Sequence, residues 1–345
     1  MNRGKGTIKG ADIAKKLMAI FFLPVLVYLV LLIIDGTQGV VYNIFSGDAL
    51  ASILRRASYM TIVALGIGFQ LKYGRFDFSG GAIIVVSATV GGVIADALGA
   101  NWLVMTVFSI MTGVILSVIN SLVYSIFRIP ISVISLAMAY LFESLPGIIL
   151  GGNAGPGITY NPSLNAIGTF PLILLPFFIA VILYVVYDKF TVAGRQSMLL
   201  NQNQLAAVNI GINEKKNTVI CYVVTGFIFG LAGAIYAAQN FLGPITSPLQ
   251  TTGTLFSNII PSLFGLFLSR YINDGLGTFV GALTITILYY GLELIGVKSG
   301  MRTLCYACFL AAFILISGFW DHIIPFFIRK FKQLAAKLKP KKEIA

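Results

Sequence analysis

The sequence predicts an all-α integral membrane protein with about ten transmembrane helices and with both termini in the cytoplasm. Residues of the types AVILMFWYC make up 57% of the 345 residues, charged residues make up 10%, and the mean hydropathy is +0.91. Soluble domains are roughly 45–50% apolar and about 25% charged. The composition therefore excludes a water-soluble enzyme and a disordered chain.

Apolar stretches of membrane-spanning length recur along the whole chain. A helix needs about 20 apolar residues to cross the hydrocarbon core. The candidate spans are 17–34, 52–71, 79–98, 102–127, 130–150, 170–187, 217–239, 254–269, 276–297 and 303–320. The first stretch lacks a small-x-small cleavage site before Asp35, so we interpret it as a retained span rather than a signal peptide.

The positive charges predict the orientation. The formal net charge is +12, but 12 of the 24 Lys and Arg residues lie in the two tails and form no stripe for nucleic acid. With a cytoplasmic N-terminus, 20 of the 24 fall on the inner side, and the outer loops 151–169 and 240–253 contain none. We therefore expect cytoplasmic basic tails at 1–16 and 321–345, flanking a membrane domain at 17–320 that contacts lipid.

No catalytic, metal-binding or cofactor-binding pattern is found in the sequence. The single histidine, His322, has no second histidine or cysteine in sequence reach, and three cysteines are too few for a typical structural zinc site. No ATP-binding motif is present. We expect a non-enzymatic protein without cofactor or metal, whose energy comes from another chain or from an ion gradient.

Small residues at four-residue spacing indicate closely packed helices. Gly226 with Gly230 and Gly277 with Gly281 have this spacing, which lets two helix backbones approach in a membrane. We interpret these glycines as helix-packing residues.

Two acidic residues in apolar surroundings are candidates for a transport path. Glu143 lies within the stretch 130–150, and Asp77 lies at the inner start of 79–98. A buried charge is costly in a bilayer and often functional. The alternative is a structural role, with Asp77 paired to Arg75 or Lys72 and Glu143 hydrogen-bonded to a neighbouring helix.

The longest predicted inner loop, 188–216, is too polar to span the membrane. Residues 201–210 are expected to form one short helix on the membrane face, with Gly211 as its C-terminal stop. The loop is either an ordinary connection or a docking surface for a soluble partner.

At this loop the sequence resembles the ribose/galactose/xylose-type permeases of bacterial ATP-binding-cassette (ABC) importers. Their Gly-Arg…Asn-x-x-Ala-Ala-x-x-x-Gly-Ile stretch is matched by Gly194, Arg195, Asn203, Ala206, Ala207, Gly211 and Ile212. Three further segments are similar: 74–82, 226–234 and 274–282. Two departures stand out, since Arg75 replaces a usual glycine and Gln204 replaces an acidic residue.

The resemblance implies a permease that imports a sugar or sugar-like solute by alternating access. An extracytoplasmic binding protein would deliver the solute, a separate ABC ATPase would act through the coupling loop 188–216, and a second copy or paralogue would complete a dimer in the bacterial cytoplasmic membrane. The alternatives are a nucleoside or branched-chain amino acid permease of the same kind, or a secondary carrier that needs no ATPase.

Overall fold

A computed structural model describes residues 24–29, 31, 46–127, 129–269, 272–309 and 311–315. The tails 1–16 and 321–345, with His322, lie outside these residues. The chain divides into two compact units, Met1–Gly291 and Leu292–Ala345. In the second unit the described part contains an apolar helix, Ser299–Leu315.

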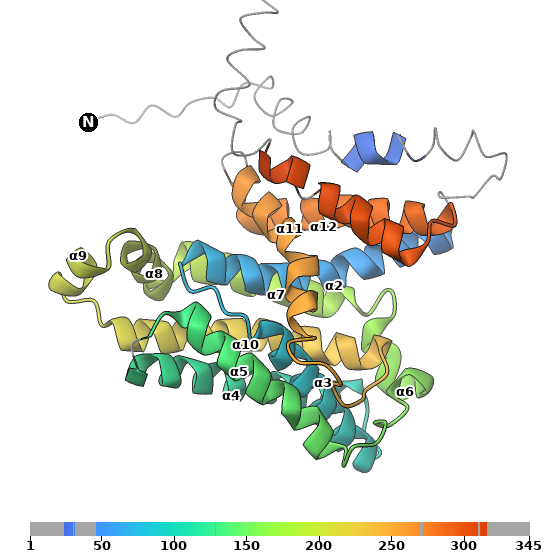
Figure 1. Cartoon of the computed structure of the whole chain (residues 1–345), viewed down its shortest axis with the longest axis horizontal. Coiled ribbons are helices and arrows are strands. Elements are labelled where there is room, and N and C mark those ends of the chain that lie inside the picture. Colours follow the sequence, from blue (N-terminus) through green and yellow to red (C-terminus); the bar gives the residue numbers. More distant parts are fainter. Residues whose placement is uncertain are drawn as a thin grey trace, which may run out of the picture. The chain divides into compact units, whose positions relative to one another are not determined.

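The described residues are helical and contain no strand (Figure 1). Residues 24–29 and 31 are helical as well. The principal helices are α2 (Gly47–Lys72), α3 (Gly80–Ala97), α4 (Trp102–Phe127), α5 (Ile131–Ile149), α6 (Pro162–Asn165), α7 (Leu174–Val185), α8 (Val192–Gln202), α9 (Gln204–Asn209), α10 (Glu214–Gln239), α11 (Thr252–Leu268) and α12 (Asp274–Leu294). Short 3₁₀ turns cover Ile158–Tyr160 and Ala166–Gly168, and a π-helical turn covers Val186–Phe190.

Six helices are long and apolar enough to cross a membrane, or seven if the bent pair Leu174–Phe190 and Val192–Gln202 forms one span. The chain is therefore a multi-pass membrane protein. Nine of the ten predicted stretches coincide with described helices, but the number of about ten spans stays a prediction. The stretch 254–269 corresponds to α11, which has only 17 residues, and 17–34 lies mostly outside the described residues.

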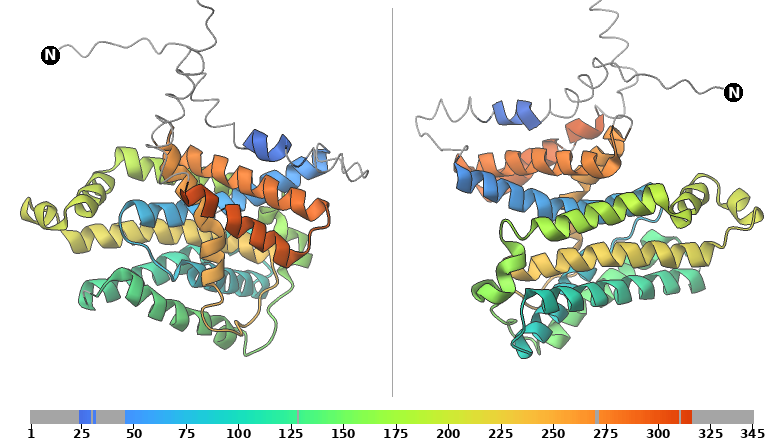
Figure 2. Two further views of the ribbon diagram at one scale, coloured as in Figure 1. Left: turned by 45° about the horizontal axis from the view of Figure 1, so that its top comes forward. Right: turned by 180° about the vertical axis from the view of Figure 1, so that it is seen from behind.

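From α2 to α10, successive long helices run antiparallel, so their ends gather at two ends of the bundle (Figure 2). We call the end that carries Lys72, Phe127 and Glu214 the inner end, after the orientation that the charges predict. The opposite end, which carries the loop 151–169, is the outer end.

Glycines bring α4 and α10 into backbone contact. A Cβ added at Gly226 would lie 2.5 Å from the carbonyl oxygen of Gly113, and one at Gly230 would lie 2.5 Å from Cα of Ile110. Such distances leave no room for a methyl group, so only glycine permits this helix pair to pack as it does.

The same arrangement joins α11 to α12. A Cβ at Gly281 would lie 2.6 Å from Cβ of Phe264, and one at Gly277 would lie 3.1 Å from Cα of Gly265. All four glycines that the sequence pairs at four-residue spacing thus lie where two helices approach each other.

The helix α11 crosses the other helices steeply (Figure 1). The loop before it, 240–253, is predicted as an outer loop, and it is largely exposed up to Gln250, whereas Thr251 is buried. Leu249 and Thr251 lie beside the buried Glu143 of α5, and a Cβ at Gly81 would lie 2.1 Å from the carbonyl oxygen of Thr251. The Glu143 carboxylate supplies hydrogen-bond acceptors for the backbone N–H groups of Leu249 and Thr251 and so ties the start of α11 to α5.

A second irregular segment, residues 73–79 between α2 and α3, enters from the inner end. Arg75 is only 6% exposed and Asp77 is fully buried. Asp77 accepts a hydrogen bond from Asn120 of α4 at 2.6 Å, and Asn120 lies about 10 Å from the inner end of that helix at about 1.5 Å per residue. The rings of Phe78 and Phe256, 6.1 Å apart, bring this segment to the start of α11.

Candidate functional site

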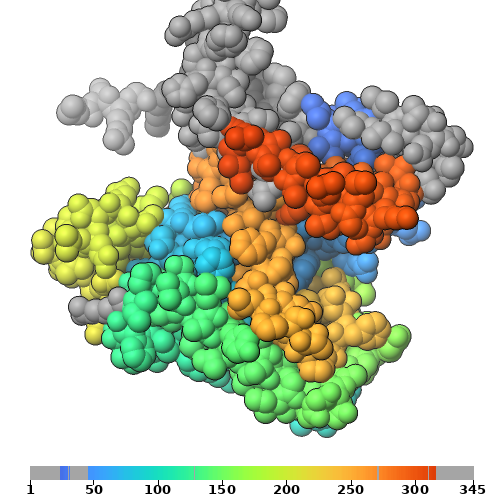
Figure 3. All heavy atoms as spheres, viewed as in Figure 1, coloured from blue at the N-terminus to red at the C-terminus, as the bar shows by residue number. Residues whose placement is uncertain are grey.

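The predicted coupling loop folds into two short helices, α8 and α9. The axis bends by 70° between Leu174–Phe190 and Val192–Gln202, so α8 turns away from the span that precedes it. Thr191 caps α8 by accepting a hydrogen bond from the backbone N–H of Gly194 at 3.0 Å. The atoms of α8 and α9 form a lobe that stands out from the neighbouring helix ends (Figure 3).

The expected helix over 201–210 is wrong at its start. The helix α8 ends at Gln202, and a separate helix, α9, begins at Gln204. The two are separated because Asn203 adopts an extended conformation, and its side chain caps α9 by accepting a hydrogen bond from Ala206 N at 3.0 Å. The expected stop at Gly211 is confirmed: its φ of +92° is the left-handed conformation typical of the residue after a helix.

Gly194 lies where α8 passes close to the π-helical turn. A Cβ at this position would lie 2.2 Å from the carbonyl oxygen of Tyr187. Arg195, the next residue, is exposed. The glycine thus sets the close approach of α8, whereas the arginine is free to face a partner.

The α8–α9 lobe has a small core and an apolar exterior. Leu200, Ala207 and Ile212 form a buried cluster, whereas Leu205 is 79% exposed and Ile210 is 72% exposed. Asn203, Ala206 and Gly211 are exposed as well. Exposed apolar patches rimmed by polar residues are typical of interaction surfaces.

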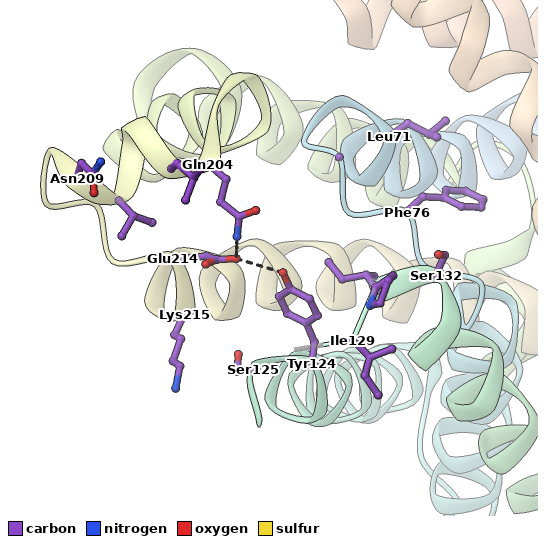
Figure 4. Close-up of a pocket in the computed structure, with 15 residues that line it drawn as sticks. Leu71, Phe76, Tyr124, Ser125, Ile129, Ser132, Gln204, Asn209, Glu214 and Lys215 are labelled. Atoms are coloured by element: carbon purple, nitrogen blue, oxygen red, sulfur yellow. Dashed lines mark hydrogen bonds between the residues drawn. The ribbon is translucent and has the colours of Figure 1, made fainter. Parts of the chain in front are cut away.

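A cavity of about 890 Å³ opens between α9 and the inner ends of α2, α4, α5 and α10 (Figure 4). Glu214, the first residue of α10, accepts hydrogen bonds there from Gln204 at 2.7 Å and from Tyr124 at 3.1 Å. The neutral Gln204 thereby ties α9 to a carboxylate on the next helix.

Three elements are joined by ion pairs at the inner end. Lys72 contacts Asp188 of the π-helical turn at 2.6 Å and also contacts Asp274, the first residue of α12. Tyr73 donates a hydrogen bond to Asp188 at 3.0 Å. Burial raises the pKa of the Tyr73 phenol, so it stays protonated and keeps this donor.

The expected pairing of Asp77 with Arg75 or Lys72 is wrong. Asp77 accepts hydrogen bonds from the backbone N–H of Ser79 at 2.7 Å, from the Ser79 hydroxyl at 2.6 Å and from Asn120 at 2.6 Å. Uncharged donors of Ser79 and Asn120 therefore satisfy this carboxylate. Arg75 instead contacts Asn217, and Lys72 contacts Asp188.

Glu143 accepts three hydrogen bonds, all at 2.6 Å. They come from the backbone N–H groups of Leu249 and Thr251 and from the Thr251 hydroxyl. The carboxylate, only 4% exposed, holds the entry to α11.

Sequence reasoning missed the polar residues that connect α8 to the bundle, chiefly Ser197, Asn201 and Asn217. The available signal was weak: Asn217 is an amide at the start of an apolar stretch. In the part of the chain that the structure describes, no group of three or more His, Cys, Asp or Glu side chains could hold a metal ion.

Residues 49–317 match the family described as branched-chain amino acid transport system / permease component. Among curated proteins, the chain is 25% identical over 289 residues to a ribose import permease of Haemophilus influenzae, covering 80% of this chain and 87% of the relative. It is 28% identical over 257 residues to the ribose import permease of Bacillus subtilis, covering 72% and 78%. A galactose/methyl galactoside import permease of Haemophilus influenzae is 22% identical over 270 residues, covering 72% of this chain and 80% of the relative.

One solved structure shares the fold. A chain of a metal-chelate-type ABC transporter in an inward-facing conformation matches with a TM-score of 0.53 and 16% sequence identity. The match covers 89% of this chain and 99% of the solved chain. At this identity the likeness concerns the fold alone.

Proposed function

The chain belongs to the family of branched-chain amino acid transport system permease components, and we propose that it is the membrane-spanning subunit of an ATP-driven importer. ATP hydrolysis takes place on a separate ABC ATPase that docks on the α8–α9 lobe. A binding protein delivers the solute at the outer end, and two permeases form the translocation unit in the bacterial cytoplasmic membrane.

The observation that carries this proposal is the exposed apolar surface of α8 and α9. Leu205 and Ile210 project from a segment that bends away from its span and keeps a separate small core. Ala206 and Gly211, two of the residues that match the importer pattern, lie on the same exposed segment. A soluble partner that binds this lobe can displace α8 and thereby the helices that α8 contacts.

The cargo proposed is a sugar or sugar-like solute. This proposal is supported by the similar proteins, which are ribose and galactose/methyl galactoside import permeases. The family description names branched-chain amino acids, so such an amino acid is the second cargo to assay, followed by a nucleoside.

Affinity capture from native membranes tests the assignment. The wild-type protein should retain an ATPase with Walker motifs, and the reconstituted complex should take up solute only with ATP. Ala206→Arg, which places a charged side chain on the exposed face of α9, should abolish both while membrane insertion is unchanged. Uptake by the permease alone would instead establish a secondary carrier.

A further inference from the structure

The α8–α9 lobe touches the irregular segment 73–79 directly. Asn201 of α8 donates a hydrogen bond to the carbonyl oxygen of Lys72 at 3.0 Å. Gly74 has a φ of +67°, and a Cβ there would lie 2.1 Å from Oδ1 of Asn201. The end of α8 therefore rests on the start of segment 73–79 without room between them.

A second connection runs through one buried amide. Arg75 donates from Nη2 to Oδ1 of Asn217 at 2.9 Å, and the Ser197 hydroxyl of α8 donates to the same oxygen at 2.8 Å. The amide nitrogen of Asn217 donates to the carbonyl oxygen of Ala193 at 2.9 Å. Asn217 of α10 thus holds both α8 and Arg75.

Arg75 carries a buried positive charge, so the loss of its contacts with Asn217 is costly. The guanidinium is buried, its Nη1 atom has no hydrogen-bond partner within the described residues, and those residues form no ion pair with it. A buried cation depends on the few partners it has. Displacement of α8 and Asn217 without Arg75 would break the hydrogen bond between Nη2 of the guanidinium and Asn217, so it is less costly when Arg75 moves with them.

The far end of segment 73–79 contacts two further helices, α5 and α11. Phe78 donates its backbone N–H to Ser135 of α5 at 3.0 Å, and its ring meets Phe256 at the start of α11. One short segment therefore connects the α8–α9 lobe with α5 and with the start of α11.

We propose that Arg75 is a positioning residue that makes α8 and segment 73–79 move as one body. In this mechanism, engagement of the ATPase displaces α8, and the Arg75–Asn217–Ser197 contacts carry the displacement to Phe78 and the start of α11. The inference rests on the proposed function.

Hydrogen–deuterium exchange of the permease in nanodiscs tests the mechanism without knowledge of the cargo. The comparison is the permease alone against the permease bound to its ATPase with ATP and vanadate. The backbone N–H groups of Arg75 and Phe78 donate hydrogen bonds to Gln70 O and to Ser135. Their exchange rates therefore change when segment 73–79 moves. In the wild type, exchange should change both at 192–212 and at 73–79.

Arg75→Met keeps side-chain length and removes the donors. It should retain the change at 192–212 but reduce the change at 73–79 at least fivefold, and Arg75→Lys should restore at least half of it. Ser197→Ala, a milder substitution on α8, should reduce the response at 73–79 about twofold. Arg55→Met, which removes one charge near the outer end of α2, should behave as the wild type.

A wild-type response at 73–79 in both Arg75→Met and Ser197→Ala would overturn the inference, as would a wild-type complex that responds at 192–212 alone. The absence of any response at 192–212 in the wild type, together with no bound ATPase, would overturn the proposed function itself. The two failures are therefore distinguishable.

Discussion

Lys72 at the end of α2 contacts Asp274 at the start of α12, although 202 residues separate them in the sequence. The same ammonium group contacts Asp188 at 2.6 Å. One cation therefore holds the inner ends of α2, α12 and the π-helical turn together, and it reduces the repulsion between the two carboxylates.

Lys72→Met should destabilise the protein strongly. Removal of one partner from a buried ion pair leaves uncompensated charge and costs about 3–5 kcal/mol. Thermal unfolding in detergent measures the loss. Lys189→Met is the matched control, because Lys189 contacts Asp188 at 3.2 Å with its side chain 54% exposed, and exposed pairs contribute about 0–1 kcal/mol. Equal melting temperatures for the two variants would refute the structural role of Lys72.

Two glycine-to-alanine substitutions, one at a helix contact and one in open space, should change stability in opposite directions. Gly226→Ala forces a methyl group against Gly113 and should cost about 1–3 kcal/mol by overpacking. Gly253→Ala lies in α11 with nothing within 4 Å of the added Cβ, so it should stabilise the helix by up to about 1 kcal/mol. Melting temperatures of the two variants check both signs, and a neutral Gly226→Ala would contradict the close α4–α10 contact.

The helices could be predicted from sequence because hydropathy is a local signal. The stretch 102–127 coincides with α4, and 130–150 differs from α5 by one residue at each end. Two features could not be predicted: the π-helical turn Val186–Phe190 with its 70° bend, and the hydrogen bonds of Glu143 with Leu249 and Thr251. Both depend on tertiary contacts that leave no periodicity in the sequence.

The candidate site shows the same division. Gly211 carried a local conformational signal, and its role as a helix stop was predictable. The Arg75–Asn217 contact was not, because its partners are 142 residues apart. Each residue alone is only a polar group near the end of an apolar stretch, so only the folded chain reveals which ones meet.

Glu143→Gln should loosen the entry to α11. The amide loses one acceptor oxygen and directs N–H groups at the N–H donors of Leu249 or Thr251, and a hydrogen bond to a charged group contributes about 1.5–3 kcal/mol. The expected results are a lower melting temperature and faster amide exchange at 249–252. Ser144→Ala, at the adjacent exposed position, should change neither. Lost uptake with unchanged stability and exchange would instead indicate that Glu143 lines the transport path.

The docking surface on the α8–α9 lobe should depend on its exposed apolar side chains. Burial of a leucine or isoleucine side chain contributes about 1.5–3 kcal/mol, and about 1.4 kcal/mol corresponds to a tenfold change in affinity. Leu205→Glu and Ile210→Glu should therefore each weaken ATPase binding tenfold or more, because a carboxylate cannot be buried against an apolar groove without a partner. Titration of the purified ATPase against permease in nanodiscs measures this affinity.

Leu98→Glu provides the control, since Leu98 is 65% exposed at the outer end of the bundle. It should bind the ATPase with wild-type affinity. All three variants should elute as single species with the melting temperature of the wild type, because their side chains make few internal contacts. Wild-type affinity for Leu205→Glu and Ile210→Glu together would show that the ATPase does not use this lobe, and docking would then have to involve another inner surface.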